Sequence, residues 1–339
     1  MTTSLWGLPA PDLEEATDAA ETDLLAWRGS RLLVTGGTGF VGSWVTSTIL
    51  HANQRLGLRL SLVAITRNPR SVLAGHPAVE LIAADARCLP DVGNVDGVIA
   101  GAASSCALPD SPDAHADTIA ETIVSGTIGA LRTAARTRSR LLLLSSGAVY
   151  GRPADSVVET ATSSLDPMRD GSAYGSAKRA AEALVASASA QGRIEGVVAR
   201  LFSFVGPGLP TDAHFAAGNF VADALEGRAI RVRGDGTAVR SYMYPSDLAA
   251  WALGLLTRGT SGEAYNVGSP DAVTIAELAE RTAAAVQPSP PVEISEPPRQ
   301  DPVDAYVPGV GKAASLGLGC RVDLDDALRR TIAWHRARA

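Results

Sequence analysis

The chain has 339 residues, of which 46% are hydrophobic and 19% charged, and its formal net charge is −6 at pH 7. This balance is typical of a globular protein and gives no electrostatic reason to expect a nucleic acid or an anionic membrane as a partner. The three cysteines stand far apart, with neither a metal-binding spacing nor a disulfide framework. Because the N-terminus lacks a signal-like pattern and no apolar run approaches about 18 residues, we expect a cytoplasmic protein without a metal site.

Residues 1–29 are acidic, and the stretch PDLEEATDAAETDLLAW predicts an amphipathic helix. We expect an N-terminal extension without a catalytic role, whose Leu13, Leu24, Leu25 and Trp27 lie against the body of the protein.

From residue 31 onward, short apolar runs alternate with helical stretches. Strands are predicted at RLLVTG, LSLVAITR, VELIAADA, DGVIAGAAS, RLLLLSS and IEGVVARLFSFVG. The alternation predicts an α/β fold with a doubly wound, Rossmann-type parallel sheet in residues 30–204, to which 238–258 returns. Residues 205–237 and 259–339 are expected to form a smaller α+β domain that binds the substrate.

A glycine-rich loop follows the first strand, in the sequence LLVTGGTGFVGS. Its glycines let the backbone approach a pyrophosphate, and the helix that begins there offers free N–H groups. Strand, loop and helix stand in the order that a dinucleotide site requires. The residues expected to contact the cofactor in this region are Gly36, Thr38, Gly39, Phe40, Val41, Gly42, Asp85, Ala86 and Ala102.

The second strand ends in AITRNP, with Arg67 near the position where NAD-binding units carry an acid. An arginine can pair with a 2′-phosphate, so Arg67 favours NADP over NAD. The alternative is that Arg67 stacks on the adenine of NAD or points to solvent. Asp85 is placed to accept a hydrogen bond from the adenine amine, with an ordinary turn residue as its alternative.

The sequence AYGSAK places Tyr174 four residues before Lys178, on one face of a predicted helix. A neighbouring ammonium stabilises a phenolate, which lets Tyr174 act as a base. Lys178 can at the same time hold the nicotinamide ribose. The buried run in LLLLSSGAVYG delivers Ser145 and Ser146 to the end of a sheet, where α/β enzymes place their chemistry.

The glycine loop, Asp85, SSGAVYG and YGSAK together resemble the extended short-chain dehydrogenase/reductase family. More narrowly, they resemble its NAD-dependent epimerase/dehydratase group, which acts on nucleotide sugars. The likeness runs from residue 31 nearly to the C-terminus. It implies that Ser146 and Tyr174 grip one sugar hydroxyl and that Tyr174 removes its proton while the carbon gives a hydride to the nicotinamide. Ser145 is then a packing residue or a helper at the substrate.

The resemblance extends to the substrate side. It implies that Arg240 in GDGTAVRSYMYPSDLA and Arg299 in PPRQD contact the substrate diphosphate, and that Asn219 holds its phosphates or sugar. The alternative for each is a solvent-exposed polar residue. The resemblance also implies a homodimer through helices near 115–137 and 174–190.

Three positions depart from the family pattern. Thr122 and Ile123 stand where an asparagine is usual, Ser203 replaces another asparagine, and Ala100 replaces a histidine. These differences concern the substrate site and leave Ser146, Tyr174 and Lys178 in place.

Gly147 and Ala148 stand at the positions where the family's 4,6-dehydratases share an acidic pair. The family's decarboxylases typically keep a glutamate in the same region. Without such an acid, we expect a nucleotide-sugar epimerase that works through a transient 4-keto intermediate. An NADPH-dependent reductase of a nucleotide 4-ketosugar is the alternative that Arg67 favours. A dehydratase or decarboxylase would need acids from elsewhere in the fold. A non-catalytic dinucleotide-sensing protein fits least, because it would not need Tyr174 and Lys178.

Overall fold

The computed structural model describes residues 5–103, 116–151, 153, 155–169, 171–211, 215–297 and 304–338. Its centre is a seven-stranded sheet in the order β3-β2-β1-β4-β5-β6-β9, in which every pair is parallel. The strands are β1 (Arg31–Thr35), β2 (Ser61–Thr66), β3 (Val79–Ala83), β4 (Gly97–Ala100), β5 (Arg140–Ser146), β6 (Glu195–Leu201) and β9 (Ala264–Val267). The Rossmann-type fold predicted from the sequence is therefore confirmed.

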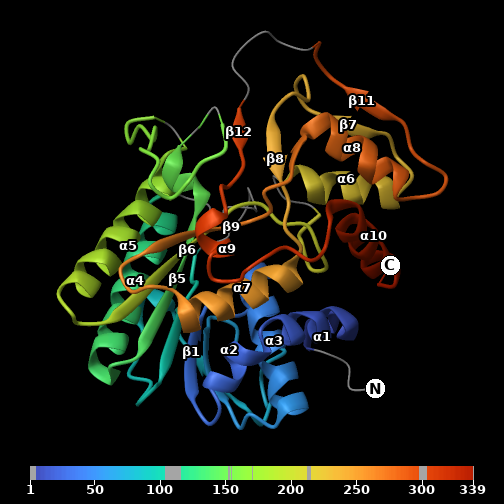
Figure 1. Cartoon of the computed structure of the whole chain (residues 1–339). Helices are drawn as coiled ribbons and strands as arrows, with labels where there is room; N and C mark the ends of the chain where they lie inside the picture. Colours follow the sequence, from blue (N-terminus) through green and yellow to red (C-terminus); the bar gives the residue numbers. More distant parts are fainter. Residues whose placement is uncertain are drawn as a thin grey trace.

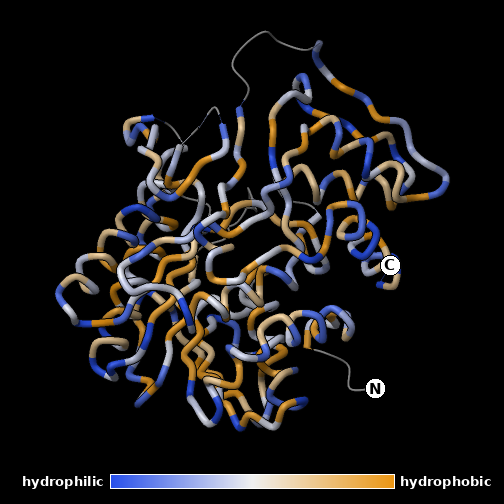
Figure 2. Tube along the Cα trace, in the orientation of Figure 1, coloured by the Kyte–Doolittle hydropathy of each residue, from blue (hydrophilic) through white to orange (hydrophobic). Residues whose placement is uncertain are grey.

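Helices cover both faces of this sheet (Figure 1). Since successive side chains of a strand point to opposite faces, Leu33 of β1 packs with α4 and α5, whereas Leu32 and Val34 pack with α3 and α7. The hydrophobic residues accordingly run along the central strands (Figure 2). The four helices are α3 (Phe40–Leu56), α4 (Ala116–Thr137), α5 (Ala173–Ala190) and α7 (Pro245–Arg258). None of the described helices combines the length and apolar character needed to cross a membrane.

The N-terminal extension forms α1 (Ala10–Ala19) and α2 (Glu21–Ala26), which pack on α3 and α7. Its Asp12 is buried, accepting hydrogen bonds from the Tyr244 hydroxyl and, at 2.7 Å, from Arg330. Leu13 and Leu24 are buried as expected, but Leu25 is 41% exposed because it lies on the outer face of its helix. The extension is thus part of the main core.

The remaining elements form a smaller α+β lobe, at the upper right of Figure 1. Its strands pair in the orders β10-β8-β12 and β11-β7. The elements of the lobe are α6 (Ala216–Leu225), β7 (Ile230–Val232), β8 (Val239–Ser241), β10 (Ala272–Thr274), α8 (Ile275–Ala284), β11 (Val292–Ile294), β12 (Ala305–Tyr306) and α10 (Leu324–Arg336). The short helix α9 (Gly311–Ala314) instead lies beside β9 of the main sheet.

Two strands depart from the domain bounds expected from the sequence. Strand β9 falls in the range assigned to the second lobe, yet it pairs with β6 at the edge of the main sheet. Strand β8 falls in the segment expected to return to the main sheet, yet it pairs with β10 and β12. Of that segment, only the helix α7 packs against the main sheet. Strands of three or four residues take their place from pairing partners that no local pattern specifies.

Candidate functional site

A cavity of about 720 Å³ lies at the carboxyl ends of the central strands, between the main sheet and the smaller lobe. In a doubly wound sheet this edge is where a nucleotide and its substrate meet. Among its lining residues are Gly36, Gly39, Phe40, Val41, Gly42, Gly101, Leu144, Ser145, Ser146, Ala148, Tyr174, Lys178, Phe202, Ser203, Phe204, Phe215, Arg240, Tyr242, Ile275 and Tyr306.

Two glycines of the loop, Gly36 and Gly42, pack so tightly that a side chain would not fit at either position. Gly36 has a φ of 72°, and a Cβ there would lie 2.9 Å from the backbone nitrogen of Ala102. A Cβ on Gly42 would lie 2.6 Å from the Cα of Gly37. Helix α3 begins at Phe40, and first-turn N–H groups have no partner within their own helix. This cradle and these donors fit the pyrophosphate of a nicotinamide dinucleotide.

The adenosine end of the cofactor site is expected beside Asp85 and Arg67. The Asp85 carboxylate accepts hydrogen bonds from the backbone and guanidinium of Arg87, at 2.8–3.1 Å. These bonds with Arg87, with a smaller contribution from the charge of Arg67, lower the pKa of Asp85. Arg67 is exposed. The adenine contact of Asp85 and the 2′-phosphate contact of Arg67 stay predictions, as do the contacts expected of Thr38, Ala86 and Ala102.

Ser146, Tyr174 and Lys178 line the same cavity, as their pattern predicts. Ser146 ends β5, and the other two residues lie on the first turns of α5. Lys178 is 4% exposed; its Nζ donates to the Leu144 carbonyl at 2.7 Å and lies 5.8 Å from the Tyr174 ring centroid. The strand end thereby fixes the ammonium close to the phenol, an arrangement suited to proton transfer.

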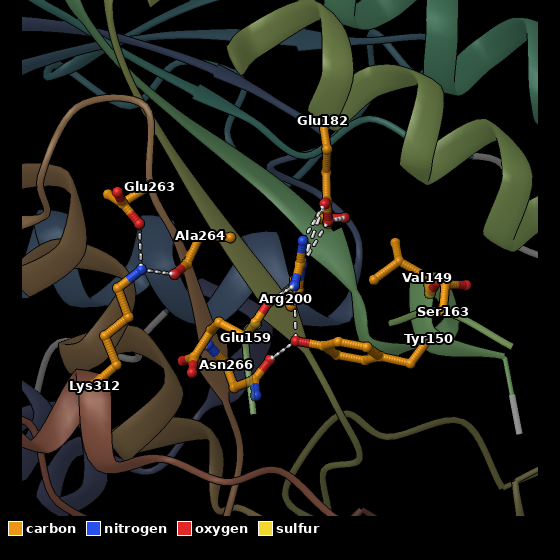
Figure 3. A network of polar contacts seen from close by, with 11 residues as sticks. Val149, Tyr150, Glu159, Ser163, Glu182, Arg200, Glu263, Ala264, Asn266 and Lys312 are labelled. Atoms are coloured by element: carbon orange, nitrogen blue, oxygen red, sulfur yellow. Dashed lines mark hydrogen bonds and ion pairs between the residues drawn. The ribbon is translucent and has the colours of Figure 1, made fainter. Parts of the chain in front are cut away.

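A part-buried ion pair holds α5 against the strands (Figure 3). Glu182 of α5 and Arg200 of β6 are 13% and 16% exposed, and the guanidinium donates to the carboxylate at 2.7–3.2 Å. The Ser145 hydroxyl donates to the same carboxylate at 2.6 Å. This contact makes Ser145 a link between β5 and α5; the substrate contact expected of it stays a prediction.

The same network continues to the far edge of the sheet. Arg200 donates to the Tyr150 hydroxyl at 2.8 Å, and that hydroxyl donates to the Asn266 side chain of β9 at 2.8 Å (Figure 3). Asn266 in turn donates to the Val157 carbonyl at 2.8 Å. The network therefore ties together α5, three strands and the loop that follows Ser146.

Gly147, the position without a side chain, faces an aromatic ring. A Cβ there would lie 2.6 Å from the Tyr306 hydroxyl oxygen and 2.9 Å from Phe202. The Tyr306 and Phe202 ring centroids are 4.6 Å apart. Tyr306 comes from β12, more than 150 residues along the chain. No sequence pattern indicated it, because β12 is two residues long and its partner β8 is remote.

On the substrate side, Arg240 lines the cavity, and the diphosphate contact expected of it stays a prediction. Its guanidinium donates to the Asp304 carboxylate and carbonyl, both at 2.9 Å. Helix α6 contributes Ala216 and Ala217 to the lining, and Asn219 lies further along that helix. The predicted phosphate contact of Asn219 stays a prediction. Arg299 lies outside the described residues.

Other side chains of the site had weaker signals. Glu182 follows Lys178 by four residues, so Tyr174, Lys178 and Glu182 share one helix face, and this spacing could have revealed it. Phe204, Phe215 and Tyr242 line the cavity from positions outside the named helices and strands, which carry no periodic signal. Within the described ranges, no group of three or more His, Cys, Asp or Glu side chains could hold a metal ion.

The model of the NAD dependent epimerase/dehydratase family matches residues 32–268. The chain belongs to this family. It is similar to UDP-glucuronic acid decarboxylase 1 of Arabidopsis thaliana, with 30% identity over 321 residues, 91% of this chain and 70% of that protein. It is 32% identical to UDP-glucuronic acid decarboxylase 6 of the same plant over 305 residues, 88% of this chain and 86% of that protein. Both of these relatives are UDP-glucuronic acid decarboxylases.

Solved structures of the family show the same fold. UDP-glucose 4-epimerase from Thermotoga maritima aligns with a TM-score of 0.75 and 21% identity, covering 91% of this chain and 99% of that one. MoeE5, solved with UDP-glucose and NAD, aligns with a TM-score of 0.74 and 25% identity over 91% of this chain and 99% of its own. The chain is therefore an enzyme of the extended short-chain dehydrogenase/reductase group, in a family described as NAD dependent.

The first prediction concerns the base. Tyr174→Phe removes the phenol oxygen and should lower turnover roughly 10²- to 10⁴-fold, the usual contribution of a general base, while cofactor binding is retained. Steady-state kinetics and cofactor titration check this. Tyr265→Phe is the control, because the Tyr265 hydroxyl accepts a hydrogen bond from the Thr260 backbone and Tyr265 lies on β9. Full activity of Tyr174→Phe would remove Tyr174 from the mechanism.

The second prediction concerns the ion pair. Glu182→Gln leaves the Arg200 charge buried without its partner and should lower the free energy of unfolding by about 3 kcal/mol. The control is Glu195→Gln, whose exposed pair with Arg140 should contribute at most about 1 kcal/mol. Urea unfolding measures both. Equal losses would mean that the Glu182 pair is no more than a surface contact.

Proposed function

We propose that the protein is a nucleoside-diphosphate-sugar 4-epimerase that works through a transient 4-keto sugar. The observation that carries the proposal is the composition of the cavity wall. Ser146, Tyr174 and Lys178 are together, while Tyr306 fills the space beside Gly147. The wall thus holds the residues for oxidation of a carbinol, and an aromatic ring stands where elimination would need an acid.

Each side chain has a defined task in this reaction. A nicotinamide dinucleotide held by the glycine loop supplies a reversible hydride acceptor. Tyr174 takes the proton of the sugar hydroxyl on oxidation. It returns a proton after the keto sugar has rotated and presents its other face to the nicotinamide. Lys178 stabilises the phenolate, and the Ser146 hydroxyl orients the sugar oxygen. Arg240 pairs with the substrate diphosphate.

The cavity also favours a neutral sugar. Among the described lining residues, the positive charges belong to Lys178 and Arg240. Lys178 donates to the Leu144 carbonyl, and Arg240 is paired with Asp304. A sugar carboxylate is best matched by a cation, and the proposed reaction assigns Lys178 to the Tyr174 phenolate and Arg240 to the diphosphate.

A second candidate is a UDP-glucuronic acid decarboxylase, favoured by relatives that are 30% and 32% identical. Oxidation of that substrate at C4 gives a β-keto acid. The bond between C5 and the carboxylate then breaks, carbon dioxide leaves, and the electron pair passes to the ketone as an enolate that is later protonated. This course uses the same Ser146, Tyr174 and Lys178.

A panel of nucleotide sugars distinguishes the candidates. The protein is incubated with NAD or NADP and with UDP-glucose, UDP-glucuronic acid and the dTDP-, GDP- and CDP-linked hexoses, and products are identified by proton NMR and mass spectrometry. We expect a product of unchanged mass with an inverted C4 and no net cofactor consumption. Loss of carbon dioxide from UDP-glucuronic acid would replace the proposal with the decarboxylase. Stoichiometric NADPH oxidation by a 4-ketosugar would replace it with the reductase.

The finer cofactor preference follows from Arg67. We expect NADP to bind more tightly than NAD and Arg67→Ala to weaken NADP binding roughly ten- to a hundredfold, as for loss of a charged hydrogen bond. NAD binding should change little. Fluorescence titration of each cofactor measures this, with Arg70→Ala as the control in the same exposed loop. A wild-type preference for NAD would instead assign Arg67 to adenine stacking or solvent.

The homodimer predicted through α4 and α5 is also part of this proposal. These helices lie side by side on one face of the sheet, and sedimentation velocity measures the oligomeric state.

A further inference from the structure

The N-terminal extension has no task in the proposed reaction, yet buried polar contacts attach it to both lobes. Asp12 of α1 is 4% exposed, and its two carboxylate oxygens have different partners. Oδ2 accepts a hydrogen bond from the Tyr244 hydroxyl at 2.5 Å, and Oδ1 accepts one from the Arg330 guanidinium at 2.7 Å. A buried carboxylate requires such partners in place of water, so Asp12 holds Tyr244 and Arg330 together.

Arg330 belongs to α10, the last helix of the smaller lobe. Besides its bond to Asp12, the guanidinium donates to the Glu15 carboxylate of α1 at 2.7 and 3.1 Å. Trp334, one turn further along α10, donates its indole N–H to the Gly7 carbonyl at 2.9 Å. Helix α10 in turn packs on α6 and α8, while α1 packs on α3 and α7. The extension therefore links the last helix of the smaller lobe to the main domain (Figure 1).

Tyr244 connects the Asp12 carboxylate with the wall of the cavity. It stands two residues after Tyr242 and four after Arg240, both of which line the cavity, and directly before α7. Its side chain is fully buried, with the Trp44 ring of α3 edge-on at 5.9 Å between centroids. Because so few residues intervene, a contact that fixes Tyr244 also limits where Tyr242 and Arg240 can lie.

A second part of the cavity wall also borders the extension. Leu209 and Pro210 line the cavity. The residue before them, Gly208, lies beside the buried Leu8, because a Cβ at Gly208 would be 4.0 Å from the Leu8 Cδ2. The first residues of α6 line the cavity as well, and α6 packs against α10. The substrate-side wall therefore meets the extension at more than one point, directly or through α10.

We propose that the N-terminal extension is a positioning element for the nucleotide sugar and that Asp12 is its central residue. Asp12 fixes α10 through Arg330 and the segment after Arg240 through Tyr244, and so holds the smaller lobe in place against the cofactor-binding sheet. Among the described residues, the cavity lining includes none from the extension, so it acts through the wall and not by contact. The inference deepens the proposed function and rests on it, because that function assigns the nucleotide sugar to this wall.

Two neighbouring glutamates of α1 offer a matched pair of variants. Glu15 bonds with Arg330 of the smaller lobe. Glu14 instead bonds with His51 and Arg55 of α3, within the main domain. The two glutamate side chains are 42% and 45% exposed, respectively. Glu15→Ala thus removes a contact between the lobes, and Glu14→Ala removes a contact of similar exposure that stays within one lobe.

Hydrogen exchange tests the link between the lobes without any substrate. In Asp12→Asn, protection of the α10 amides should fall about tenfold, as for loss of a charged hydrogen bond. Glu15→Ala should lower it about two- to fivefold, the effect of an exposed pair, and Glu14→Ala should leave it as in the wild type. Mass spectrometry of peptides from α10 measures this, with β1 as the reference for global unfolding. Equal losses in α10 and β1, or an equal effect of the two glutamate variants, would overturn the proposal.

Ligand titration tests the positioning role. Asp12→Asn should weaken binding of UDP-glucose or UDP-glucuronic acid about tenfold, because apparent affinity falls with the fraction of protein in the competent arrangement. The affinity for NAD or NADP should be unchanged, since the glycine loop belongs to the main domain, and Glu14→Ala should change neither affinity. If Asp12→Asn does not fold, Glu15→Ala replaces it, with an expected effect of about two- to fivefold. Unchanged nucleotide-sugar binding, or equal weakening of both ligands, would overturn the proposal.

The outcomes separate this inference from the proposed function. If a nucleotide sugar binds but no C4 inversion is found, the epimerase proposal fails and the titration still decides the role of Asp12. If neither nucleotide sugar binds, the proposed function fails for these two ligands, and hydrogen exchange decides the inference by itself.

Discussion

The ion pair between Glu182 and Arg200 is the interaction on which the geometry of the site depends. Arg200 belongs to β6 and Glu182 to α5, so the pair fixes the helix that carries Tyr174 and Lys178 against the sheet. Ser145 joins it from β5 at 2.6 Å, next to Ser146. A serine on a strand and a tyrosine on a helix can act on one substrate group only when they are held to within a fraction of an ångström, and a largely buried charge pair provides such a link.

Removing the charges of such a pair from water is costly, and its net contribution to stability is smaller than its Coulomb energy suggests. The value of the pair here is geometric. Through Tyr150 and Asn266, it also connects the loop after Ser146 with the edge strand β9. The main sheet, α5 and this loop are therefore one hydrogen-bonded unit, beside which the smaller lobe places Arg240 and Tyr306.

The wall of the cavity shows how a family with one oxidation step can follow different courses. Ser146, Tyr174 and Lys178 are suited to move a proton and a hydride at one carbon. The reaction that follows oxidation depends on the side chains next to these three residues, because elimination needs an acid and a base at neighbouring atoms. In this chain Gly147 offers no side chain and Tyr306 occupies its space. Because several relatives are decarboxylases, product analysis has to distinguish inversion at C4 from loss of carbon dioxide.

The sequence by itself determined six strands of the main sheet, the glycine loop and the spacing of Ser146, Tyr174 and Lys178, because each depends on local order: an apolar run, a glycine at a tight turn, or a four-residue spacing on a helix. Only the tertiary structure decided that β9 joins the main sheet, that Leu25 faces solvent, that Ser145 bonds to Glu182, and that Tyr306 stands against Gly147. These contacts join residues far apart in the chain, through strands as short as two residues, and short strands take their place from their partners rather than from their own composition.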